Sequence, residues 1–545
     1  MSAIEDASQK RKNGVDLDQI LVKQVGQFGR YQMMILTLII LPVIFSAFTS
    51  GEYIFTTARI PTRCFIDQCD GESPDFSAPW VSNAIPQFSN GLYDNCARFA
   101  NSTIPVKVTG DGCPNTLFNN NITWTCDTYV YNNTHSVVYD FNLACDDWRR
   151  SRIGSLRNIG RLLAMPATGF VSDRWGRRVA LGLNAFNSVW IGLARSFVNS
   201  YEWFTALEVI EAMFGAGIYS SCYLLVTELV GPKYRVMVGA ALSTTFSIGQ
   251  VILSAIAWAV PQWRKLTQVL YLPQLFVVVY FWFMSESVRW LMSKGRYEDA
   301  EIILKRVAKT NNKELSEKSL KSFRESAEIE KNTVKLKEQW LPIQVIKSRV
   351  IFSRCLVTPV WWVTNSLVYS GMLINSINLS GNPYLNYAMV SAIGIPAHWT
   401  TILLLDVVGR KPVVISGYMA CAVCQFLIAV LPEDKKTLLL VIYLVGKFCI
   451  SVVIVSVYIY TVELYPTKYR HSLFAFSSMV GQLGGITAPL TPALALEVWL
   501  SLPSVIFGIM ALLSAMLVVT TPETVGIKLP NTMQEAENLS LQRTS

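Results

Sequence analysis

One short motif occurs twice in this chain, with the two copies 235 positions apart. The first copy is Thr227-Glu-Leu-Val-Gly-Pro-Lys-Tyr-Arg235 and the second is Val462-Glu-Leu-Tyr-Pro-Thr-Lys-Tyr-Arg470. An unrelated motif repeats at almost the same offset, because Asp173-Arg-Trp-Gly-Arg-Arg178 has a counterpart in Asp406-Val-Val-Gly-Arg-Lys411. Two motifs that share one offset indicate a chain built from two equivalent halves.

Long apolar runs between these motifs indicate a membrane protein. The chain is 51% hydrophobic and only 16% charged, so a soluble protein of its 545 residues would lack surface charge. The runs have the length of about 20 residues that crosses about 30 Å of hydrocarbon. They lie at residues 31–50, 153–172, 179–198, 203–226, 236–260, 265–284, 351–376, 385–405, 412–431, 438–461, 472–495 and 499–520. The sequence therefore predicts an all-α membrane protein with twelve transmembrane helices in two six-helix, pseudo-symmetric halves.

The basic residues predict the orientation in the membrane. In the twelve-helix count, every basic cluster lies on one side, which the positive-inside rule assigns to the cytoplasm. The clusters are Arg174 with Arg177 and Arg178, Lys233 with Arg235, Arg410 with Lys411, Lys468 with Arg470, and the segment 285–350. The predicted divisions are a cytoplasmic N-terminus 1–30, a first half 31–284, a cytoplasmic linker 285–350, a second half 351–520 and a cytoplasmic tail 521–545. The net charge of +9 then reflects topology, and no nucleic-acid partner is expected.

Two further segments have simple interpretations. The first 25 residues are polar, so no cleavable signal peptide is expected. Helical spacing around Ala300-Glu-Ile-Ile-Leu-Lys-Arg306 predicts an amphipathic linker helix, which we interpret as a solvated connection in preference to a partner-binding element.

The predicted exterior loop 52–147 carries eleven acidic and four basic residues. Its six cysteines indicate three disulfides in an oxidising compartment, with fifteen pairings open. They are Cys64, Cys69, Cys96, Cys113, Cys126 and Cys145. Sequons at Asn101, Asn121 and Asn132 predict glycosylation there, whereas the sequon at Asn538 is predicted to stay unmodified in the cytoplasm. The other five cysteines are interpreted as packing residues and not as metal ligands.

A duplicated membrane bundle with a site between its halves is the architecture of secondary transporters. The run Gly169-x-x-x-Asp173-Arg-x-Gly-Arg-Arg178 resembles the loop signature of the major facilitator superfamily. Two further runs resemble motifs of the sugar and organic-ion branches of that superfamily, namely Glu286-Ser-Val-Arg-Trp-Leu291 and Pro522-Glu-Thr-Val-Gly526. The long Cys-rich loop, Val462-Glu-Leu-Tyr-Pro466 and Leu529-Pro-Asn-Thr-Met-Gln-Glu-Ala536 favour the organic-ion transporters. This resemblance implies the major facilitator fold and a plasma-membrane carrier of small organic ions.

The charged residues of the repeated motifs are candidate gating residues. Carboxylates at helix ends accept backbone N–H groups or pair with arginine. Pairs that form in one access state and break in the other set the balance between the states. The candidates are Asp173, Arg174, Arg177, Glu228, Arg235, Asp406, Arg410, Glu463 and Arg470. The alternative, that these charges only anchor the topology, stays open, above all for Arg178 and Lys411.

Arg161 is the first candidate for substrate binding. It lies twelve residues above Asp173, or about 18 Å at 1.5 Å per residue, close to the membrane midplane. Charges at that depth usually face a cavity, and an arginine there binds a carboxylate or other anion. Arg157 lies one helical turn further out on the same face. In the alternative interpretation, Arg161 pairs with a protein group such as Glu211.

Two glutamines occupy corresponding depths in the two halves. Gln482 lies twelve residues above Arg470, and Gln250 is its approximate counterpart. In organic-ion transporters the Gln482 position resembles a charge-selecting site that is acidic in the cation branch and basic in the anion branch. Asn365 and Gly394 stand where that resemblance places two further acids. Because these three positions lack the acids of the cation branch, we consider a zwitterion, or a substrate held by aromatic contacts, as a substrate.

Aromatic residues complete the predicted site. Tyr219 and Tyr223 are spaced i, i+4 on one span, Trp362 and Tyr369 share a face of another, and Tyr458 lies on a third. The family resemblance places Tyr223, Trp362 and Tyr369 in the pocket. Such rings bind apolar groups and, through cation–π contact, ammonium groups. The alternative for each ring is a packing or lipid-facing role.

Three ionisable residues outside the motifs have weaker interpretations. Glu211 and Lys447 lie at the same outer height in the two halves, which raises an outer-gate ion pair as a hypothesis, but separate partners within each half are preferred. His398 titrates near neutral pH if exposed, but a hydrogen-bonded packing role is preferred.

The functional alternatives are an organic anion transporter that uses Arg161, a sugar or polyol porter, and a receptor or membrane enzyme. The seventh span reads Trp361-Trp-Val-Thr-Asn-Ser-Leu-Val-Tyr369, without the Gln-rich motif of sugar porters. No Walker-type GK[ST] loop, HExxH or GxSxG motif is present, so no enzyme, nucleotide or cofactor is expected. No carboxylate was counted near the midplane, which favours facilitated diffusion or exchange over proton symport. Substrate identity and oligomeric state stay open.

Overall fold

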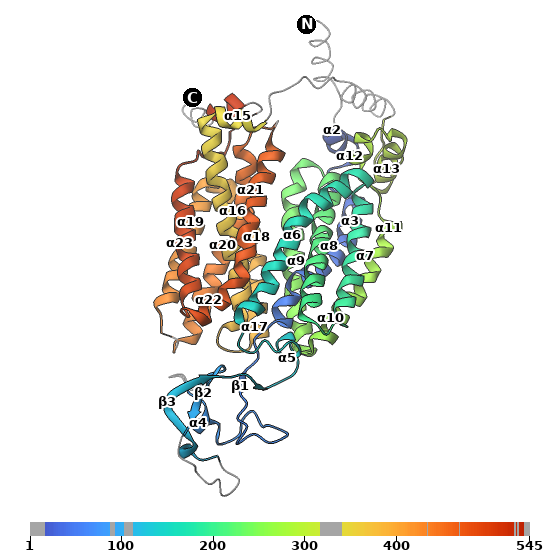
Figure 1. Ribbon diagram of the computed structural model, residues 1–545. Helices are drawn as coiled ribbons and strands as arrows, with labels where there is room; N and C mark the ends of the chain where they lie inside the picture. The colour runs from blue at the N-terminus through green and yellow to red at the C-terminus, as the bar shows by residue number, and fades with distance from the viewer. Residues whose placement is uncertain are drawn as a thin grey trace.

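Two helical bundles lie side by side, with two small β-sheets at one end of the pair (Figure 1). The computed structural model describes residues 17–87, 93–102, 113–316, 341–432, 434–467, 469–527, 530 and 533–538. Several predicted features therefore lie wholly or partly outside the described residues. They are the N-terminal segment 1–16, linker residues 317–340, Lys468 of the second motif, and Leu529, Asn531 and Thr532 of the tail.

The first bundle comes from the first half of the chain. Its elements are α2 (Leu17–Ile20), η1 (Leu21–Val25), α3 (Arg30–Thr56), α6 (Asp147–Trp175), α7 (Arg177–Arg195), α8 (Tyr201–Leu229), η3 (Pro232–Tyr234), α9 (Arg235–Ala259), α10 (Trp263–Tyr271), η4 (Leu272–Gln274) and α11 (Leu275–Phe283). Pro273 lacks an N–H, and the sixth predicted span accordingly passes through the 3₁₀ turn η4. The buried core of this bundle includes Ile39, Leu225 and Leu270.

The second bundle has its own core, which includes Trp361, Tyr418 and Val457. Its elements are α15 (Leu341–Lys347), α16 (Arg349–Asn375), η5 (Ser376–Asn378), α17 (Pro383–Ala392), α18 (Gly394–Val407), α19 (Arg410–Val430), α20 (Lys436–Leu464), α21 (Arg470–Thr487), η6 (Ala488–Leu490), α22 (Thr491–Glu497), α23 (Leu502–Val519) and α24 (Met533–Glu537). Two separate cores are what a duplicated chain requires.

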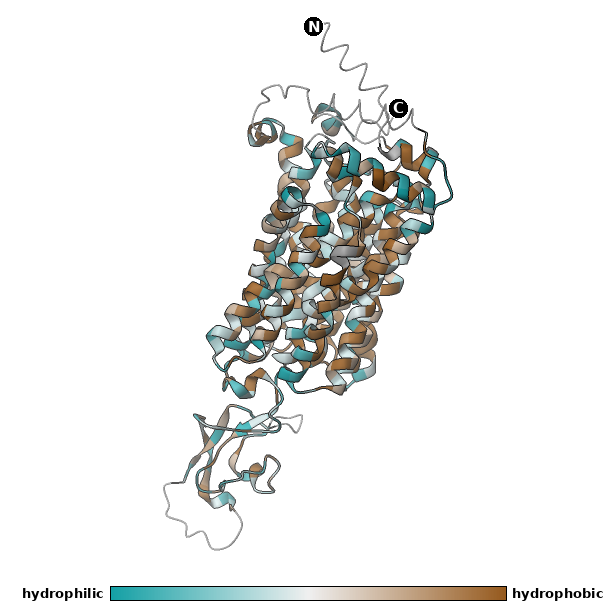
Figure 2. Ribbon diagram, turned by 90° about the vertical axis from the view of Figure 1, so that its right-hand side faces the viewer, coloured by the Kyte–Doolittle hydropathy of each residue, from teal (hydrophilic) through white to brown (hydrophobic). Residues whose placement is uncertain are grey.

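Short helices gather at the end of the bundles opposite the sheets. Here α2, α12 (Val288–Ser293) and α13 (Tyr297–Thr310) lie together over the first bundle, and α15 lies over the second (Figure 1). The helix predicted around 300–306 is α13. Hydrophobic residues dominate the middle of the long helices, and hydrophilic residues gather toward the two ends (Figure 2).

Every predicted span coincides with helix. Eight described helical segments are long and apolar enough to cross a membrane. They are Arg30–Thr56, Tyr201–Leu229, Pro232–Ala259, Pro383–Val407, Arg410–Val430, Lys436–Leu464, Arg470–Glu497 and Leu502–Val519. The other four predicted spans coincide with α6, α7, α10 to α11, and α16. Of these, α6 has a lower hydropathy because it contains buried arginines, and the span α10 to α11 is divided at Pro273.

The predicted exterior loop contains the sheets. Its elements are β1 (Thr62–Cys64), α4 (Val81–Ala84), β2 (Ala97–Asn101), η2 (Asn115–Leu117), β3 (Phe118–Thr125), β4 (Tyr129–Tyr131) and α5 (Val137–Asp140). Strand β1 pairs antiparallel with β4, and β2 with β3. The six predicted cysteines form three disulfides, Cys64–Cys126, Cys69–Cys113 and Cys96–Cys145. Of the five remaining cysteines, four are buried and Cys449 is half-buried, as packing residues would be.

One predicted boundary is wrong. The exterior loop was expected to begin at residue 52, but α3 continues to Thr56 and Glu52 is buried within it. The Glu52 carboxylate pairs with Arg195 of α7 and accepts a hydrogen bond from Thr267 of α10. Because these partners neutralise the charge, the helix can continue through it.

Hydrogen bonds and a ring contact join the two bundles toward the sheet end. Asn158 of α6 donates to the carbonyl of Gly485 (2.7 Å), and Ser254 of α9 donates to that of Tyr384 (2.5 Å). The ring of Phe55 stacks on Tyr384 at 5.6 Å. A cavity of only about 30 Å³ remains between the bundles at this end, which holds a water molecule but no organic ion. The sheet end of the interface is closed.

Candidate functional site

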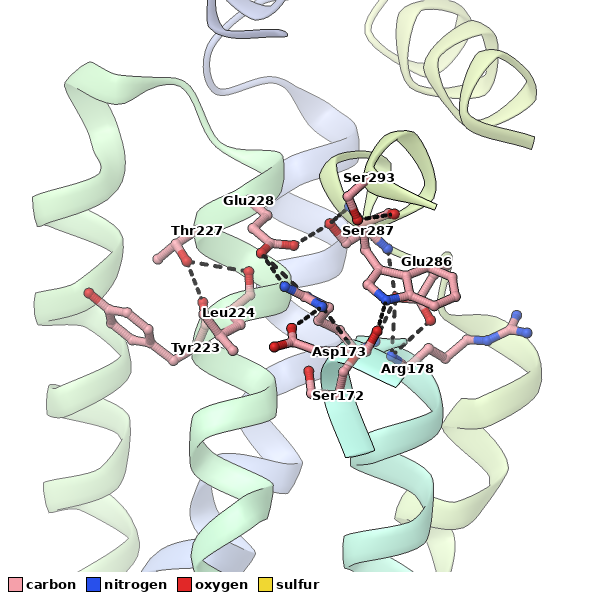
Figure 3. A network of polar contacts seen from close by, with 12 residues as sticks. Ser172, Asp173, Arg178, Tyr223, Leu224, Thr227, Glu228, Glu286, Ser287 and Ser293 are labelled. Atoms are coloured by element: carbon pink, nitrogen blue, oxygen red, sulfur yellow. Dashed lines mark hydrogen bonds and ion pairs between the residues drawn. The ribbon is translucent and has the colours of Figure 1, made fainter. Parts of the chain in front are cut away.

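The first copy of the repeated motifs forms a clamp at the end opposite the sheets. Arg177, at the start of α7, pairs with Glu228 of α8 at 3.3 Å and with Asp173 of α6 at 3.1 Å. Glu228 also accepts a hydrogen bond from Ser287, just before α12. Figure 3 shows Glu228, Asp173 and Ser287 converging from these separate elements. The clamp therefore ties α6, α7, α8 and the linker together.

The second copy repeats this clamp in the other bundle. Arg410 pairs with Glu463 at 3.2 Å and with Asp406 at 3.4 Å. Thr524 donates to Glu463 at 2.5 Å, as Ser287 does to Glu228. The duplication inferred from the sequence thus extends to individual hydrogen bonds.

A glutamate that follows the last helix of each half completes the clamp, and neither glutamate was predicted to have a role in it. Glu286 accepts the backbone N–H groups of Arg177 (2.9 Å) and Arg178 (3.2 Å), and Glu523 those of Arg410 (3.2 Å) and Lys411 (3.0 Å). These N–H groups belong to helix N-termini, where a carboxylate is stabilised. Burial raises the pKa of the Glu286 carboxyl, and the N–H donors oppose that rise. The sequence Glu-Ser/Thr-Val, repeated after the last helix of each half, was the sequence signal that could have identified these two glutamates.

Gly176 and Gly409 allow this arrangement because each has a backbone conformation that side chains avoid. Their φ values are +107° and +111°. A Cβ on Gly176 would overlap the Oε2 of Glu286, and one on Gly409 would lie 2.8 Å from Glu523 Oε2. A side chain at either position would displace the carboxylate.

The other candidate gating residues make fewer contacts than the residues at the centre of the two clamps. Asp173 and Asp406 are each 76% exposed and pair only with the arginine four residues later. Arg174 is exposed. Arg235 donates to the carbonyl of Thr227 and Arg470 to that of Tyr465. Each of these contacts lies within one bundle.

Buried ion pairs in the first bundle include residues that the sequence did not single out. Arg157 pairs with Glu208 and with Glu211 (2.7 Å), and Arg195 pairs with Glu208 (2.6 Å) and Glu52. All five side chains are at most 2% exposed. The suggested partnership of Arg161 with Glu211 is therefore wrong as an ion pair, because Arg157, one turn away, occupies that carboxylate.

Arg161 instead faces the boundary between the bundles. It donates to Ser50 Oγ of α3 (2.5 Å), and its charge is within electrostatic range of Tyr387 in the second bundle. Glu211 and Lys447 have separate partners within their own bundles, which was the preferred expectation for them, and the described structure holds no ion pair between them. The Lys447 ammonium donates to the carbonyl of Tyr369 at 2.8 Å, and lies 3.3 Å from the centre of its ring.

The predicted aromatic residues form two groups, one in each bundle. Tyr219 and Tyr223 stack at 6.5 Å on α8, with Phe246 of α9 beside Tyr219 at 5.6 Å. Trp362 of α16 contacts Tyr458 of α20 at 4.4 Å. Tyr458 lies within electrostatic range of Tyr219 and Tyr223. The two groups thus approach each other across the boundary.

Sequence reasoning missed Phe246 and Phe474, because single phenylalanines in apolar spans carry no signal. Phe474 lies 5.3 Å from Trp362. The polar candidates are distributed over both bundles: Gln250 is buried on α9, Asn365 is buried on α16, and Gln482 is half-buried on α21. Among the described residues, no cluster of three or more metal-binding side chains is present.

Comparisons with known proteins agree on a class. The family model described as "Sugar (and other) transporter" matches residues 115–535. The chain is 28% identical to the Drosophila melanogaster "Organic cation transporter protein" over 95% of this chain and 94% of that protein. It is 30% identical to human "Solute carrier family 22 member 2" over 76% of this chain and 74% of that protein. The Escherichia coli xylose transporter XylE in an inward-open conformation superposes with a TM-score of 0.56 at 18% identity, over 73% of this chain and 90% of that structure. The last match shows a shared major facilitator fold.

Proposed function

The chain belongs to the sugar and other transporter family, and on that basis we propose that it moves small organic ions across a membrane by alternating access. The curated relatives, which include organic cation transporters and members of solute carrier family 22, support organic ions as the substrate class. Membership of a transporter family agrees with the expectation that the protein is not an enzyme. A sugar or polyol substrate is the second candidate, since the matching folds include a xylose transporter.

The substrate is proposed to bind between the bundles, near their middle. The single observation that carries this proposal is the approach of two aromatic groups, Tyr219 with Tyr223 and Trp362 with Tyr458, from different bundles. Aromatic walls with a few polar groups are typical of small-molecule sites. A site shared by two halves also changes its access when the halves rock against each other.

The proposed topology has twelve transmembrane helices, with the sheets outside the plasma membrane and both termini in the cytoplasm. The halves 31–284 and 351–520 then move about the substrate, joined by the cytoplasmic linker 285–350. Disulfides in the sheet segment and the basic residues at the opposite end support this orientation. In this frame the structure is closed on the outside.

The clamps are proposed to keep each half rigid while the halves rock. Arg177 with Glu228 and Arg410 with Glu463 each join helices of one bundle. A rigid-body movement requires such connections inside each moving unit.

Uptake of radiolabelled compounds into cells that express the chain tests the proposed function. The panel is a compact organic cation, a zwitterionic amino-acid derivative, an organic anion and a hexose, each with and without an imposed membrane potential. Saturable uptake of at least one organic ion, above that of the hexose, is expected. Saturable uptake of the hexose alone would replace the organic-ion function with the sugar function.

A further inference from the structure

Lys447 is a buried basic residue of the second bundle. Its side chain is 1% exposed on α20, and its ammonium contacts the carbonyl and the ring of Tyr369. In the part of the chain that the structure describes, no carboxylate pairs with it. A buried charge without a counter-charge is destabilising by several kcal/mol in general. A buried lysine without a counter-charge tends to lose its proton, and a negative group bound beside it would stabilise its charged form.

Arg161 supplies a second cation from the other bundle. Its described polar contact is Ser50, whereas Glu211 is held by Arg157 and Ser188. Glu211 remains within electrostatic range of Arg161 and balances part of its charge. Arg161 still presents a guanidinium fork suited to a carboxylate.

Tyr387 and Tyr369 connect the two cations. Tyr387, on α17, is within electrostatic range of both Arg161 and Tyr369, and Tyr369 contacts Lys447. Arg161 and Lys447 therefore flank one group of aromatic residues at the boundary between the bundles.

Three polar side chains beside these residues are almost completely buried and have no hydrogen-bond partner in the described structure. They are the hydroxyl of Tyr387, the Oδ1 of Asn365 and the Nδ1 of His398, with exposures of 0%, 1% and 4%. Buried polar groups are normally paired, so the Tyr387 hydroxyl and the His398 Nδ1 are available to a polar ligand, whereas the Asn365 oxygen is an acceptor and cannot bond to a carboxylate. The preferred expectation of a hydrogen-bonded His398 is not met at Nδ1.

The position of Lys447 also changes what Tyr369 can bind. Tyrosine rings attract ammonium groups through their negative faces. Here one face is already occupied by an ammonium at 3.3 Å. A second cation on the opposite face would be repelled by the first. Tyr369, a residue expected to hold organic cations, is thus arranged to disfavour them.

We propose that the transported ion carries a carboxylate, which Lys447 and Arg161 bind from the two halves, and that ions bearing only positive charge are disfavoured. This inference rests on the proposed function of organic-ion transport. It deepens that function by naming the chemical group that is recognised. In this proposal Arg161 contributes from the first half and Lys447 from the second.

Choline and glycine betaine provide a matched test on the unaltered protein, because both carry a trimethylammonium group and only betaine carries a carboxylate. Uptake of each into expressing cells is compared with that of benzoate, a carboxylate without a cation. The KM for choline is expected to exceed that for betaine by about tenfold or more, since a hydrogen bond to a charged group is worth about tenfold to a hundredfold in affinity. Choline uptake with an equal or lower KM would overturn the proposal and leave organic-ion transport standing. Absence of uptake for all organic ions would overturn both.

Substitutions then test the two cations. Lys447→Gln is expected to raise the KM for betaine and benzoate by about tenfold or more, and to leave or lower the KM for choline, while Lys447→Arg retains carboxylate uptake. The matched control is Lys436→Gln, on the same helix but exposed. Arg161→Gln is compared in the same way with Arg152→Gln, an exposed position of α6. Equal changes for all three compounds at normal surface abundance would make these cations structural and overturn the proposal. If a variant fails to reach the surface, the comparison on the unaltered protein decides.

Discussion

Replacing Gly176 with alanine tests the clamp of the first bundle. The backbone at Gly176, with φ of +107° and ψ of 163°, lies in a region that is essentially restricted to glycine, and strain there costs about 1–3 kcal/mol. The added Cβ would also overlap Glu286 Oε2. Displacing that carboxylate loses at least one hydrogen bond from a helix N-terminus, worth about 1.5–3 kcal/mol. Together these effects predict a loss of about 3–6 kcal/mol.

The assay is thermal unfolding of the purified protein in detergent, at one fixed scan rate because unfolding of such proteins is commonly irreversible. At about 1 °C per kcal/mol for a chain of 545 residues, Gly176→Ala is expected to lower the transition by about 3 °C or more. The control is Gly169→Ala on the same helix, where a Cβ meets nothing within 4 Å. In a Glu286→Gln background, the loss caused by Gly176→Ala should shrink, because the displaced charge is gone. Equal transitions for Gly176→Ala and Gly169→Ala would refute the reasoning.

Three further predictions follow from other contacts. Arg157→Gln leaves buried Glu211 without its arginine and Glu208 with Arg195 alone, and should destabilise the protein by about 3–5 kcal/mol; unchanged thermal stability would contradict the described pairing. Replacing Cys96 and Cys145 together by serine opens a loop of 49 residues and should cost the sheet segment about 4 kcal/mol; faster proteolysis of that segment on intact cells is the readout, and an unchanged rate counts against it. Trp362→Ala should raise the substrate KM about tenfold while Trp362→Phe retains most affinity; similar KM values for both variants would remove this ring from the site.

The fold was largely predictable because its signals are long and repeated. Each apolar run of about 20 residues marks a helix, and the shared motif offset marks the two halves. The boundary at Glu52 was missed because a glutamate looks like the end of a span. Its partner Arg195 is 143 positions away, and no local pattern announces that pairing.

The site was predictable only in part. Spacing of i, i+4 placed Tyr219 beside Tyr223, since helical geometry fixes that relation. Spacing does not decide which of Arg157 and Arg161 reaches Glu211, because that depends on how α6 is rotated against α8. Disulfide pairing was open for the same reason, as it depends on strand packing. The sequence could not identify Tyr369 as the partner of Lys447, because this contact joins two helices whose relative position the sequence does not give.

Locking the closed end of the bundles gives the most direct test of alternating access. Ser254 of α9 donates to the carbonyl of Tyr384 across the boundary, at the sheet end. The paired substitutions Ser254→Cys and Tyr384→Cys allow a reversible cross-link there, and labelled organic-ion exchange is measured in proteoliposomes before and after cross-linking. The account predicts that the cross-link abolishes exchange and that a reductant restores it. Full exchange by the cross-linked protein would contradict a mechanism in which the halves separate at this end.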